Sequence, residues 1–303
     1  MTNHRGIRDL SGRTVVVTGG GRGIGAAMAR AFSERGARVA IGDLDGDLAA
    51  ATAASLGGGA IGRRVDVTDR AAFASFLDDV EDTLGPLAVL VNNAGIMVVD
   101  SFLDEDPDRA DLQIALNLTA VVHGSREGAR RMRAHGGGHI VNVASAAGRM
   151  GFVGVSTYCA TKFGVHGLSE ALRRELHGTG VSVSCVMPGL VATELISGVD
   201  SHPLLPTVTP EYVAVRVVRA VERGRFAVFA PRVMPAFVAA NALLPGRAMD
   251  VVMRVMGGDT LMMRGAHSPA RRAYDERTGA RPAVTEEVAS SADDAPTRAQ
   301  QTV

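Results

Sequence analysis

A tyrosine and a lysine stand four residues apart in a chain that is almost without lysine. Of the 32 basic residues among 303, Lys162 is the single lysine, and Tyr158 is one of only three tyrosines. Two side chains four residues apart on a helix share one face. A lysine ammonium beside a phenol favours the phenolate, and so lowers the tyrosine pKa from its ordinary value of about 10. Tyr158 could then exchange a proton with an alcohol or a carbonyl group.

A serine is expected close to this pair. Ser145 follows the apolar run 140–143, which is typical of a buried strand, and its hydroxyl could hydrogen-bond the same substrate oxygen. An exposed helix that carries one tyrosine and one lysine is common. The single lysine one helical turn after a tyrosine, both following a strand-end serine, is improbable by chance. Ser145, Tyr158 and Lys162 are therefore the candidate catalytic set.

A glycine-rich turn could bind a pyrophosphate. The segment 18–25, with the sequence TGGGRGIG, follows the apolar run 14–17 and precedes a segment of helical periodicity. Glycines allow a tight turn and a close approach to the phosphates, whose charge is met by the helix N-terminus. Strand-to-helix turns favour glycine in any case, so the turn is ambiguous by itself. The candidate cofactor-binding residues of this turn are Gly19, Arg22, Gly23, Ile24 and Gly25.

An acidic strand end strengthens the dinucleotide interpretation. Asp43 stands 18 residues beyond Gly25, where a carboxylate can accept hydrogen bonds from both adenosine ribose hydroxyls. Asp43 would repel a 2′-phosphate, and Asp45 adds negative charge. Arg22 is the counter-evidence, because its guanidinium could bind that phosphate. With no second basic residue flanking Asp43, the sequence favours NAD over NADP.

Strand and helix patterns alternate along the chain. Strands are expected at 14–17, 38–41, 60–65, 87–91, 139–143, 181–187 and 226–230, and helices at 23–35, 46–55, 69–84, 107–134, 157–177 and 209–223. Continuous apolar strands require helices on both faces of a parallel sheet. The sequence thus predicts a single-domain, doubly wound (Rossmann) α/β fold, in which ligands bind at the carboxyl ends of the strands.

Five motifs resemble those of one family, the short-chain dehydrogenases/reductases, over about residues 11–230. Segment 18–25 matches its TGxxxGxG pattern, segment 92–95 its NNAG, and segment 158–162 its YxxxK. Ser145 has the family position, 13 residues before the tyrosine, and segment 188–193 resembles the family's PG-xxx-T.

The resemblance implies a role for each matching residue. Tyr158 would be the acid/base, Lys162 would bind the nicotinamide ribose and lower the tyrosine pKa, and Ser145 would orient the substrate. Asn117 matches the family asparagine that holds a proton-relay water. The resemblance implies further cofactor contacts, to the adenine, the floor of the site, the nicotinamide amide and a phosphate, at Asp66, Val67, Asn93, Ala94, Gly95, Pro188, Gly189, Val191 and Thr193.

The chain divides into three parts. Residues 1–230 form the predicted catalytic domain. Residues 231–265 form a predicted helical extension, in which residues 249, 252, 253 and 256 give an apolar stripe at helical spacing. This stripe favours a helix packed on its own domain; a lid, a subunit contact and a membrane-surface helix are the alternatives. Residues 266–303 are polar and are expected to be a largely disordered tail.

The segment 194–206 is expected to choose the substrate, because the family's substrate loop follows its PG motif. It carries Leu195, Ile196, His202, Leu204 and Leu205, which favours a hydrophobic secondary alcohol or ketone, although ordinary packing would also explain them. The sequence therefore predicts an NAD-dependent oxidoreductase. An NADP-dependent carbonyl reductase and an NAD-binding regulator without catalysis remain the alternatives.

Composition excludes other classes. A net charge of +0 gives no reason to expect nucleic acid, and two cysteines with scattered histidines give no metal site. The first ten residues lack an apolar signal region, and no apolar run reaches the roughly 18 residues of a membrane span. We expect a soluble, cytoplasmic protein. The resemblance implies a homodimer or homotetramer that pairs helices 107–134 and 157–177.

Overall fold

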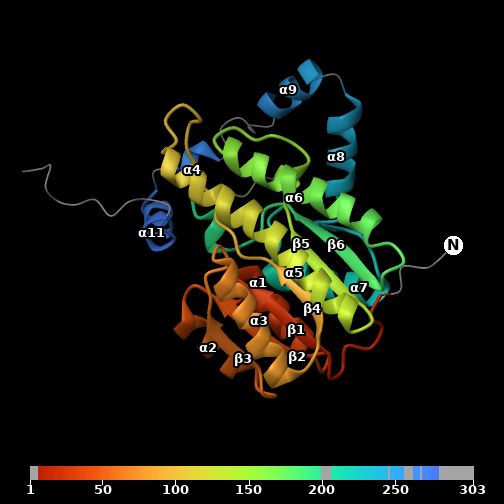
Figure 1. Cartoon of the computed structure of the whole chain (residues 1–303). Coiled ribbons are helices and arrows are strands. Elements are labelled where there is room, and N and C mark those ends of the chain that lie inside the picture. The colour runs from red at the N-terminus through yellow and green to blue at the C-terminus, as the bar shows by residue number, and fades with distance from the viewer. Residues whose placement is uncertain (1–5, 199–205, 245, 256–261, 267, 280–303) are drawn as a thin grey trace, which may run out of the picture.

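One parallel sheet organises the molecule. The computed structural model describes residues 6–198, 206–244, 246–255, 262–266 and 268–279. Its seven strands have the order β3-β2-β1-β4-β5-β6-β7 (Figure 1). The chain runs outward from β1 to one edge and then from β4 to the other, so the carboxyl ends of β1 and β4 flank the point where the strand order reverses. The strands are β1 Thr14–Thr18, β2 Arg38–Asp43, β3 Ile61–Arg64, β4 Leu87–Asn92, β5 Gly138–Val143, β6 Val181–Pro188 and β7 Ala227–Ala230.

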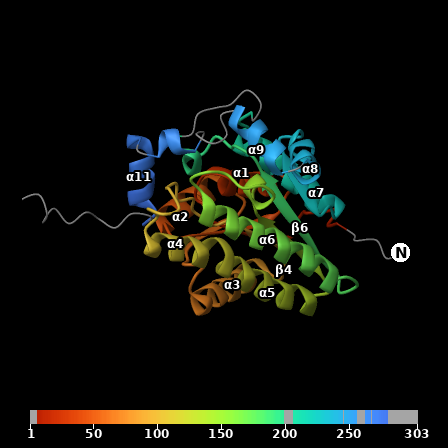
Figure 2. The same ribbon diagram turned by 90° about the horizontal axis from the view of Figure 1, so that it is seen from above.

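Helices cover both faces of this sheet, as Figure 2 shows from above. One apolar cluster joins α1, α2 and α7 to one face, and other clusters join α3, α5 and α6 to the opposite face. The central strands β1 and β4 are buried along their whole length, which explains their unbroken apolar sequence. The predicted fold class is therefore confirmed. The helices of the two layers are α1 Gly23–Ser33, α2 Gly46–Leu56, α3 Arg70–Leu84, α5 Ala120–Ala134, α6 Ser156–Glu175 and α7 Pro210–Arg223.

The long helix expected at 107–134 is present over its whole length, but it contains one π-helical turn. It consists of α4 (Pro107–Ile114), a π-helical turn η1 (Ala115–Thr119) and α5. The wide turn carries Asn117, which is fully buried. A π-helical turn contains about one residue more than an α-helical turn, which hardly disturbs the apolar periodicity of the sequence. The pattern therefore predicts the helix but not the wide turn within it.

The extension after β7 contains α8 (Met234–Leu243), α9 (Gly246–Val255) and the short 3₁₀ turn η4 (Met263–Gly265). In the expected apolar stripe at 249–256, the side chains at 249, 252 and 253 and the whole of residue 256 lie outside what the structure describes.

The expected disordered tail differs from the structure in its first part. Helix α11 (Pro269–Arg277) packs on the domain, with Arg271 and Tyr274 buried. Ser268 caps its first turn by accepting a hydrogen bond from the Arg271 N–H at 3.1 Å. A polar composition indicated a tail because the partners of these polar side chains lie far away in the sequence. Residues 280–303 lie outside the described residues.

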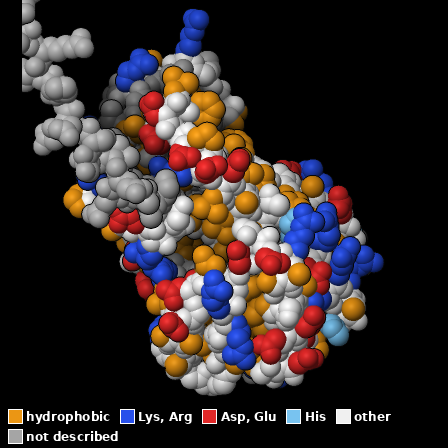
Figure 3. Space-filling view, turned by 60° about the vertical axis from the view of Figure 1, so that its left-hand side comes forward, with side chains coloured by type: hydrophobic (Ala, Val, Ile, Leu, Met, Phe, Trp, Pro, Cys, Tyr) orange, Lys and Arg blue, Asp and Glu red, His pale blue; other side chains and the backbone are white. Residues whose placement is uncertain are grey.

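The surface carries both signs of charge. The face in Figure 3 mixes acidic and basic side chains, with hydrophobic side chains gathered near its centre. None of the described helices combines the length and the apolar character that crossing a membrane requires. Both cysteines are buried free thiols, and no group of three metal-ligating His, Cys, Asp or Glu side chains occurs among the residues that the structure describes.

Candidate active site

The glycine turn after β1 is tied to the end of β4. The Asn93 amide donates to the carbonyls of Thr18 at 2.9 Å and Gly19 at 3.0 Å. Gly19 has a φ of +61°, and a Cβ there would lie 2.8 Å from the Ala94 Cα. Both the conformation and the close approach therefore require glycine. Asn93 therefore does more than satisfy its own turn, because its side chain fixes the glycine turn that follows the neighbouring strand β1.

Helix α1 begins without a side-chain cap. The residue at its N-cap, Arg22, makes no side-chain capping bond, whereas Asp45 and Asp69 cap α2 and α3. The first N–H groups of α1 therefore receive no hydrogen bond from the capping side chain, and free N–H groups at a helix N-terminus bind phosphate groups. A Cβ on Gly25 would lie 2.1 Å from the Gly19 oxygen, so the loop can close over the helix only with glycine there. These features fit the pyrophosphate of a dinucleotide.

Asp43 and Arg22 lie together at the adenosine end of this cradle. The Asp43 carboxylate accepts from the N–H groups of Gly21 at 2.9 Å and Asp45 at 3.1 Å. The Arg22 guanidinium forms ion pairs with Asp45 at 3.5 Å and Glu194 at 3.1 Å. Arg22 is thus already paired with two carboxylates, beside a third acidic side chain at the strand end.

The other proposed cofactor residues lie around the same sheet edge. Asp66 accepts from the Thr68 N–H at 2.9 Å and from its hydroxyl at 2.6 Å, so its carboxylate fixes its own turn. Thr193 approaches the glycine loop: its Cγ2 lies 3.3 Å from the place of a Cβ on Gly23. Its hydroxyl donates to the Val191 carbonyl at 3.3 Å.

Ser145, Tyr158 and Lys162 converge at the carboxyl ends of β5 and β6. The Lys162 Nζ lies 5.5 Å from the centroid of the Tyr158 ring and donates to the Val143 carbonyl at 3.0 Å. The Ser145 Oγ accepts from the Ala147 N–H at 3.1 Å, which holds the serine at the start of the short turn η2 (Ala146–Gly148). The structure thus brings together the three residues that the sequence singled out.

Burial controls the acidity of this set. It raises the pKa of Tyr158 above its ordinary value, while the hydrogen bond with Ser145 acts in the opposite direction. Burial also lowers the pKa of Lys162 to about 8. The sequence analysis expected a lowered tyrosine pKa, from the neighbouring ammonium. In the structure the shift has the opposite direction, because both groups are enclosed and desolvation is the largest cause.

Asn117 is fixed by the chain itself. Its Oδ1 accepts from the Ile96 N–H at 2.9 Å, and its Nδ2 donates to the Ile96 carbonyl at 2.7 Å. A Cβ on Gly95 would lie 2.9 Å from this Oδ1 and 3.7 Å from the Lys162 Nζ. The π-helical turn therefore pins the segment after β4 close to Lys162. The relay water implied by the family resemblance remains a prediction.

An apolar cavity opens beside Tyr158 and Ser145, with an empty volume of about 550 Å³ that includes space open to solvent. Leu195 and Ile196, expected from the sequence, lie in its wall, on the 3₁₀ turn η3 (Glu194–Ile196). His202, Leu204 and Leu205 lie outside the described residues. Other apolar lining residues were not predicted, because nothing local distinguishes them from ordinary core; among them are Met97, Phe152, Val155, Leu190, Met234 and Met262.

A parallel sheet with a glycine cradle at its switch point and a Ser-Tyr-Lys set beside a cavity defines an oxidoreductase that uses a nicotinamide dinucleotide. The family model of the short chain dehydrogenases matches residues 13–203. The chain therefore belongs to the short chain dehydrogenase family, and it is a dehydrogenase that acts on CH–OH groups.

Similar proteins include polyol dehydrogenases. A sorbitol dehydrogenase from Cereibacter sphaeroides is 38% identical over 193 residues, which are 63% of this chain and 75% of the relative. A D-threitol dehydrogenase from Mycolicibacterium smegmatis is 39% identical over 189 residues, covering 61% and 73% of the two chains. A short chain dehydrogenase/reductase from Burkholderia phymatum, solved in complex with NAD, shares the fold with a TM-score of 0.72 at 24% identity, over 81% of this chain and 96% of that chain.

Proposed function

We propose that the protein is an NAD-dependent oxidoreductase that interconverts a hydrophobic secondary alcohol and its ketone, with Tyr158 as the general acid/base. One observation carries this proposal. Tyr158 and Ser145 lie in the wall of an apolar cavity, and Lys162 lies beside the Tyr158 ring. Lys162 is also close to Gly95, in the segment after β4 that contacts the glycine turn. A reacting oxygen bound between the two hydroxyls would be within reach of both.

When bound, the nicotinamide would accept or supply the hydride. The residues of the chain supply the rest. Ser145 holds the substrate oxygen, and Tyr158 gives it a proton in reduction or takes that proton in oxidation. Lys162 binds the nicotinamide ribose and favours the phenolate by its charge. Asn117 holds Ile96, and with it the segment next to Lys162, in place.

The electrostatics of the adenosine end favour NAD. The Asp43 carboxylate would face the ribose, where a 2′-phosphate would meet a like charge. Arg22, the cation that could compensate for this, is already paired with Asp45 and Glu194. The similar Burkholderia phymatum protein was solved with NAD, which agrees with this choice.

The cavity favours a hydrophobic substrate over a polyol. Its wall is made mostly of Met, Phe, Val, Leu and Ile side chains, which offer a sugar alcohol few hydrogen-bonding partners. The names of the similar sorbitol and D-threitol dehydrogenases point to polyols instead. The lining belongs to this chain, so we give it the greater weight.

The test is turnover of a substrate panel by the purified protein. Hydrophobic secondary alcohols, sorbitol and D-threitol would each be offered with NAD⁺ and with NADP⁺, and the appearance of reduced nicotinamide followed. We expect turnover of the hydrophobic alcohols with NAD⁺. Turnover of the polyols alone would overturn the substrate class, and preference for NADP⁺ would mean that Arg22 outweighs Asp43.

The Tyr158→Phe variant separates an enzyme from a regulator that only binds NAD. Hydride transfer should fall by about 10²–10⁴-fold, the usual contribution of a general acid/base. Binding of NAD⁺, followed by calorimetry, should persist, because the cradle is untouched. We also expect the chain to associate as a homodimer or homotetramer through α5 and α6, which sedimentation analysis would test.

A further inference from the structure

One guanidinium on α11 joins two walls of the substrate cavity. Arg271 is fully buried, and its side chain donates to the Leu195 carbonyl at 3.0 Å and to the Met97 carbonyl. Leu195 and Met97 both line the cavity, from η3 and from the segment after β4. The planar fork of an arginine can hold two separate carbonyls at fixed positions, which a lysine ammonium cannot do with the same geometry.

The same helix holds the other backbone group of Met97. The Met97 N–H donates to the Tyr274 hydroxyl at 3.2 Å. The Arg271 guanidinium lies 4.5 Å from the centroid of the Tyr274 ring, so the two side chains support each other. Both polar backbone groups of this cavity residue are therefore fixed by α11.

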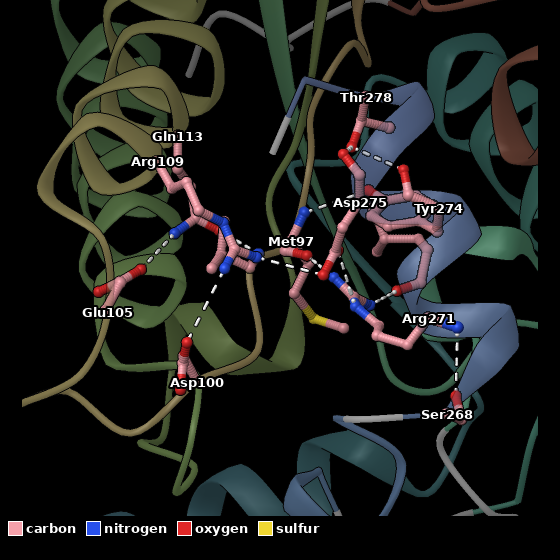
Figure 4. A network of polar contacts seen from close by, with 12 residues as sticks. Met97, Asp100, Glu105, Arg109, Gln113, Ser268, Arg271, Tyr274, Asp275 and Thr278 are labelled. Carbon is pink, nitrogen blue, oxygen red and sulfur yellow. Dashed lines mark hydrogen bonds and ion pairs between the residues drawn. The ribbon is translucent and has the colours of Figure 1, made fainter. Parts of the chain in front are cut away.

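The buried charge of Arg271 is compensated. Asp275, also buried, lies one helical turn later, with its Oδ1 3.1 Å from the Arg271 Nε. The Asp275 Oδ2 accepts from Arg109 of α4 at 3.2 Å, and Arg109 lies 3.8 Å from Asp100. Figure 4 shows the α11 side chains directed toward Met97 and Arg109. Pairing of this kind is what allows a guanidinium to be enclosed at all.

Residues just before α11 close the cavity from the same side. Met262 lies in its wall, and Met262 and Ala266 belong to the apolar cluster that contains Tyr158 and Cys159. The segment 262–279 is thus continuous with the substrate site, as far as the structure describes it.

We infer that α11 supports the wall of the substrate cavity from behind and that Arg271 is a positioning residue, which holds Met97 and Leu195 in that wall and so sets the preference for bulky hydrophobic substrates. The part of this inference that concerns substrates rests on the proposed function. The part that concerns the wall can be tested without turnover.

A purely structural role would give a different result. If Arg271 only stabilised the fold, its replacement would lower the activity toward all substrates in the same proportion. If it positions Met97 and Leu195, a small alcohol that reaches only Tyr158 and Ser145 should be spared. A large alcohol that contacts the wall should lose affinity.

The first experiment measures access to Cys159 by thiol labelling, with the labelled peptides quantified by mass. Cys159 is 7% exposed and belongs to the same apolar cluster as the wall residues Met97 and Met262, whereas Cys185 is 0% exposed and serves as an internal reference. In Arg271→Met we expect labelling of Cys159 to accelerate by about ten-fold, as for a local opening, with Cys185 unchanged. The matched control is Arg219→Lys, on the exposed side of α7, which should behave as the wild type. Unchanged labelling of Cys159 in a folded Arg271→Met protein would overturn the inference, and so would equal acceleration of both cysteines.

The second experiment compares kinetics with a bulky secondary alcohol and with 2-propanol. In Arg271→Met, KM for the bulky alcohol should rise by about ten-fold, while kcat/KM for 2-propanol changes by less than about three-fold. Arg271→Lys should lie between this variant and the wild type, and the Kd for NAD⁺ should stay the same in both. Equal losses for the two alcohols would overturn the positioning role.

Two arrangements keep these outcomes interpretable. If Arg271→Met does not fold, the double variant Arg271→Met/Asp275→Asn removes both charges of the pair and leaves an amide oxygen able to accept from Arg109, and the same outcomes apply to it. If the wild type turns over neither alcohol, the proposed function fails, while the labelling result still decides whether α11 supports the wall.

Discussion

Two buried cations lie beside the same cavity, and they are held in opposite ways. Lys162 is 5% exposed and Arg271 is 0% exposed. Lys162 donates to the Val143 carbonyl, and no ion pair involves it within the described residues. Arg271 donates hydrogen bonds to two backbone carbonyls and forms an ion pair with the Asp275 carboxylate.

The difference separates a group kept for chemistry from a group kept for shape. Enclosing a charge without a counter-charge costs free energy, which for Lys162 is visible as a pKa lowered to about 8. Such a cost is typical of functional sites, and in the proposed function the charge of Lys162 acts on the cofactor and on Tyr158. Arg271, whose charge is compensated, can serve as a cross-link between walls. The comparison predicts that replacing the two residues has opposite effects on stability.

The largest expected effect is the loss of activity in Lys162→Met. We expect kcat/KM to fall by about 10²–10⁴-fold, because the tyrosine loses the charge that favours its phenolate. Steady-state kinetics with NAD⁺ and the best alcohol of the panel would measure it, with Arg219→Lys as the control. Activity near that of the wild type would remove Lys162 from the catalytic set.

Stability should move in opposite directions in the two variants. Arg271→Met is expected to lower the free energy of unfolding by about 3 kcal/mol, since it breaks a buried ion pair. The loss is limited because Asp275 keeps its ion pair with Arg109. Lys162→Met is expected to raise it by about 1–3 kcal/mol, because the desolvated charge is gone. Urea unfolding of both variants and the wild type would measure these changes. Destabilisation of similar size in both variants would contradict the proposed difference between an uncompensated Lys162 and a compensated Arg271.

The difference in stability between Lys162→Met and the wild type should also depend on pH. The Lys162 pKa is lowered from 10.5 to about 8 in the folded state, so between these values the unfolded chain binds more protons. The free energy of unfolding contributed by Lys162 therefore rises as pH increases through this window. The advantage of Lys162→Met over the wild type should be full below pH 8 and shrink toward pH 10.5. Taking the difference cancels the thiols and phenols common to both proteins, and an advantage that does not change with pH would contradict the assignment.

The smallest expected effect concerns Ser145. Its hydrogen bond lowers the pKa of Tyr158 against the larger effect of burial. Ser145→Ala should therefore move the alkaline rise of kcat/KM for alcohol oxidation to higher pH, by less than about one unit, the equivalent of one modest hydrogen bond. Arg271→Lys, the comparison variant, should leave the position of this rise unchanged. A shift to lower pH in Ser145→Ala would show that the serine does not stabilise the phenolate.

Local patterns predicted the layered fold, and they singled out three side chains that the structure brings together. Each strand is a short apolar run, and Ser145, Tyr158 and Lys162 lie on neighbouring elements whose carboxyl ends must meet. The direction of the tyrosine pKa shift was wrong, because burial depends on residues that close over the site from distant segments. The pairing of Arg22 with Glu194 joins residues 172 positions apart, and no local pattern predicts it.

The misinterpretation of α11 has a similar cause. A polar segment normally cannot bury enough surface to stay ordered. Here Arg271 reaches Met97 across 174 positions of sequence, and this contact turns polar residues into buried ones. Two local signals were present: Ser268 followed by Pro269, a helix start, and an Arg and an Asp four residues apart.

The π-helical turn η1 changes what an insertion or a deletion would do to this protein. Consecutive residues of an α-helix are about 100° apart around its axis, at 3.6 residues per turn. The wide turn takes up about one residue more than an α-helical turn, so deleting one residue from 115–119 would leave a regular helix in which α4 and α5 keep nearly the same facing. Arg109 would therefore stay on the side of Asp275. The deletion would instead remove the wide turn from which Asn117 holds Ile96, and so loosen the segment beside Lys162.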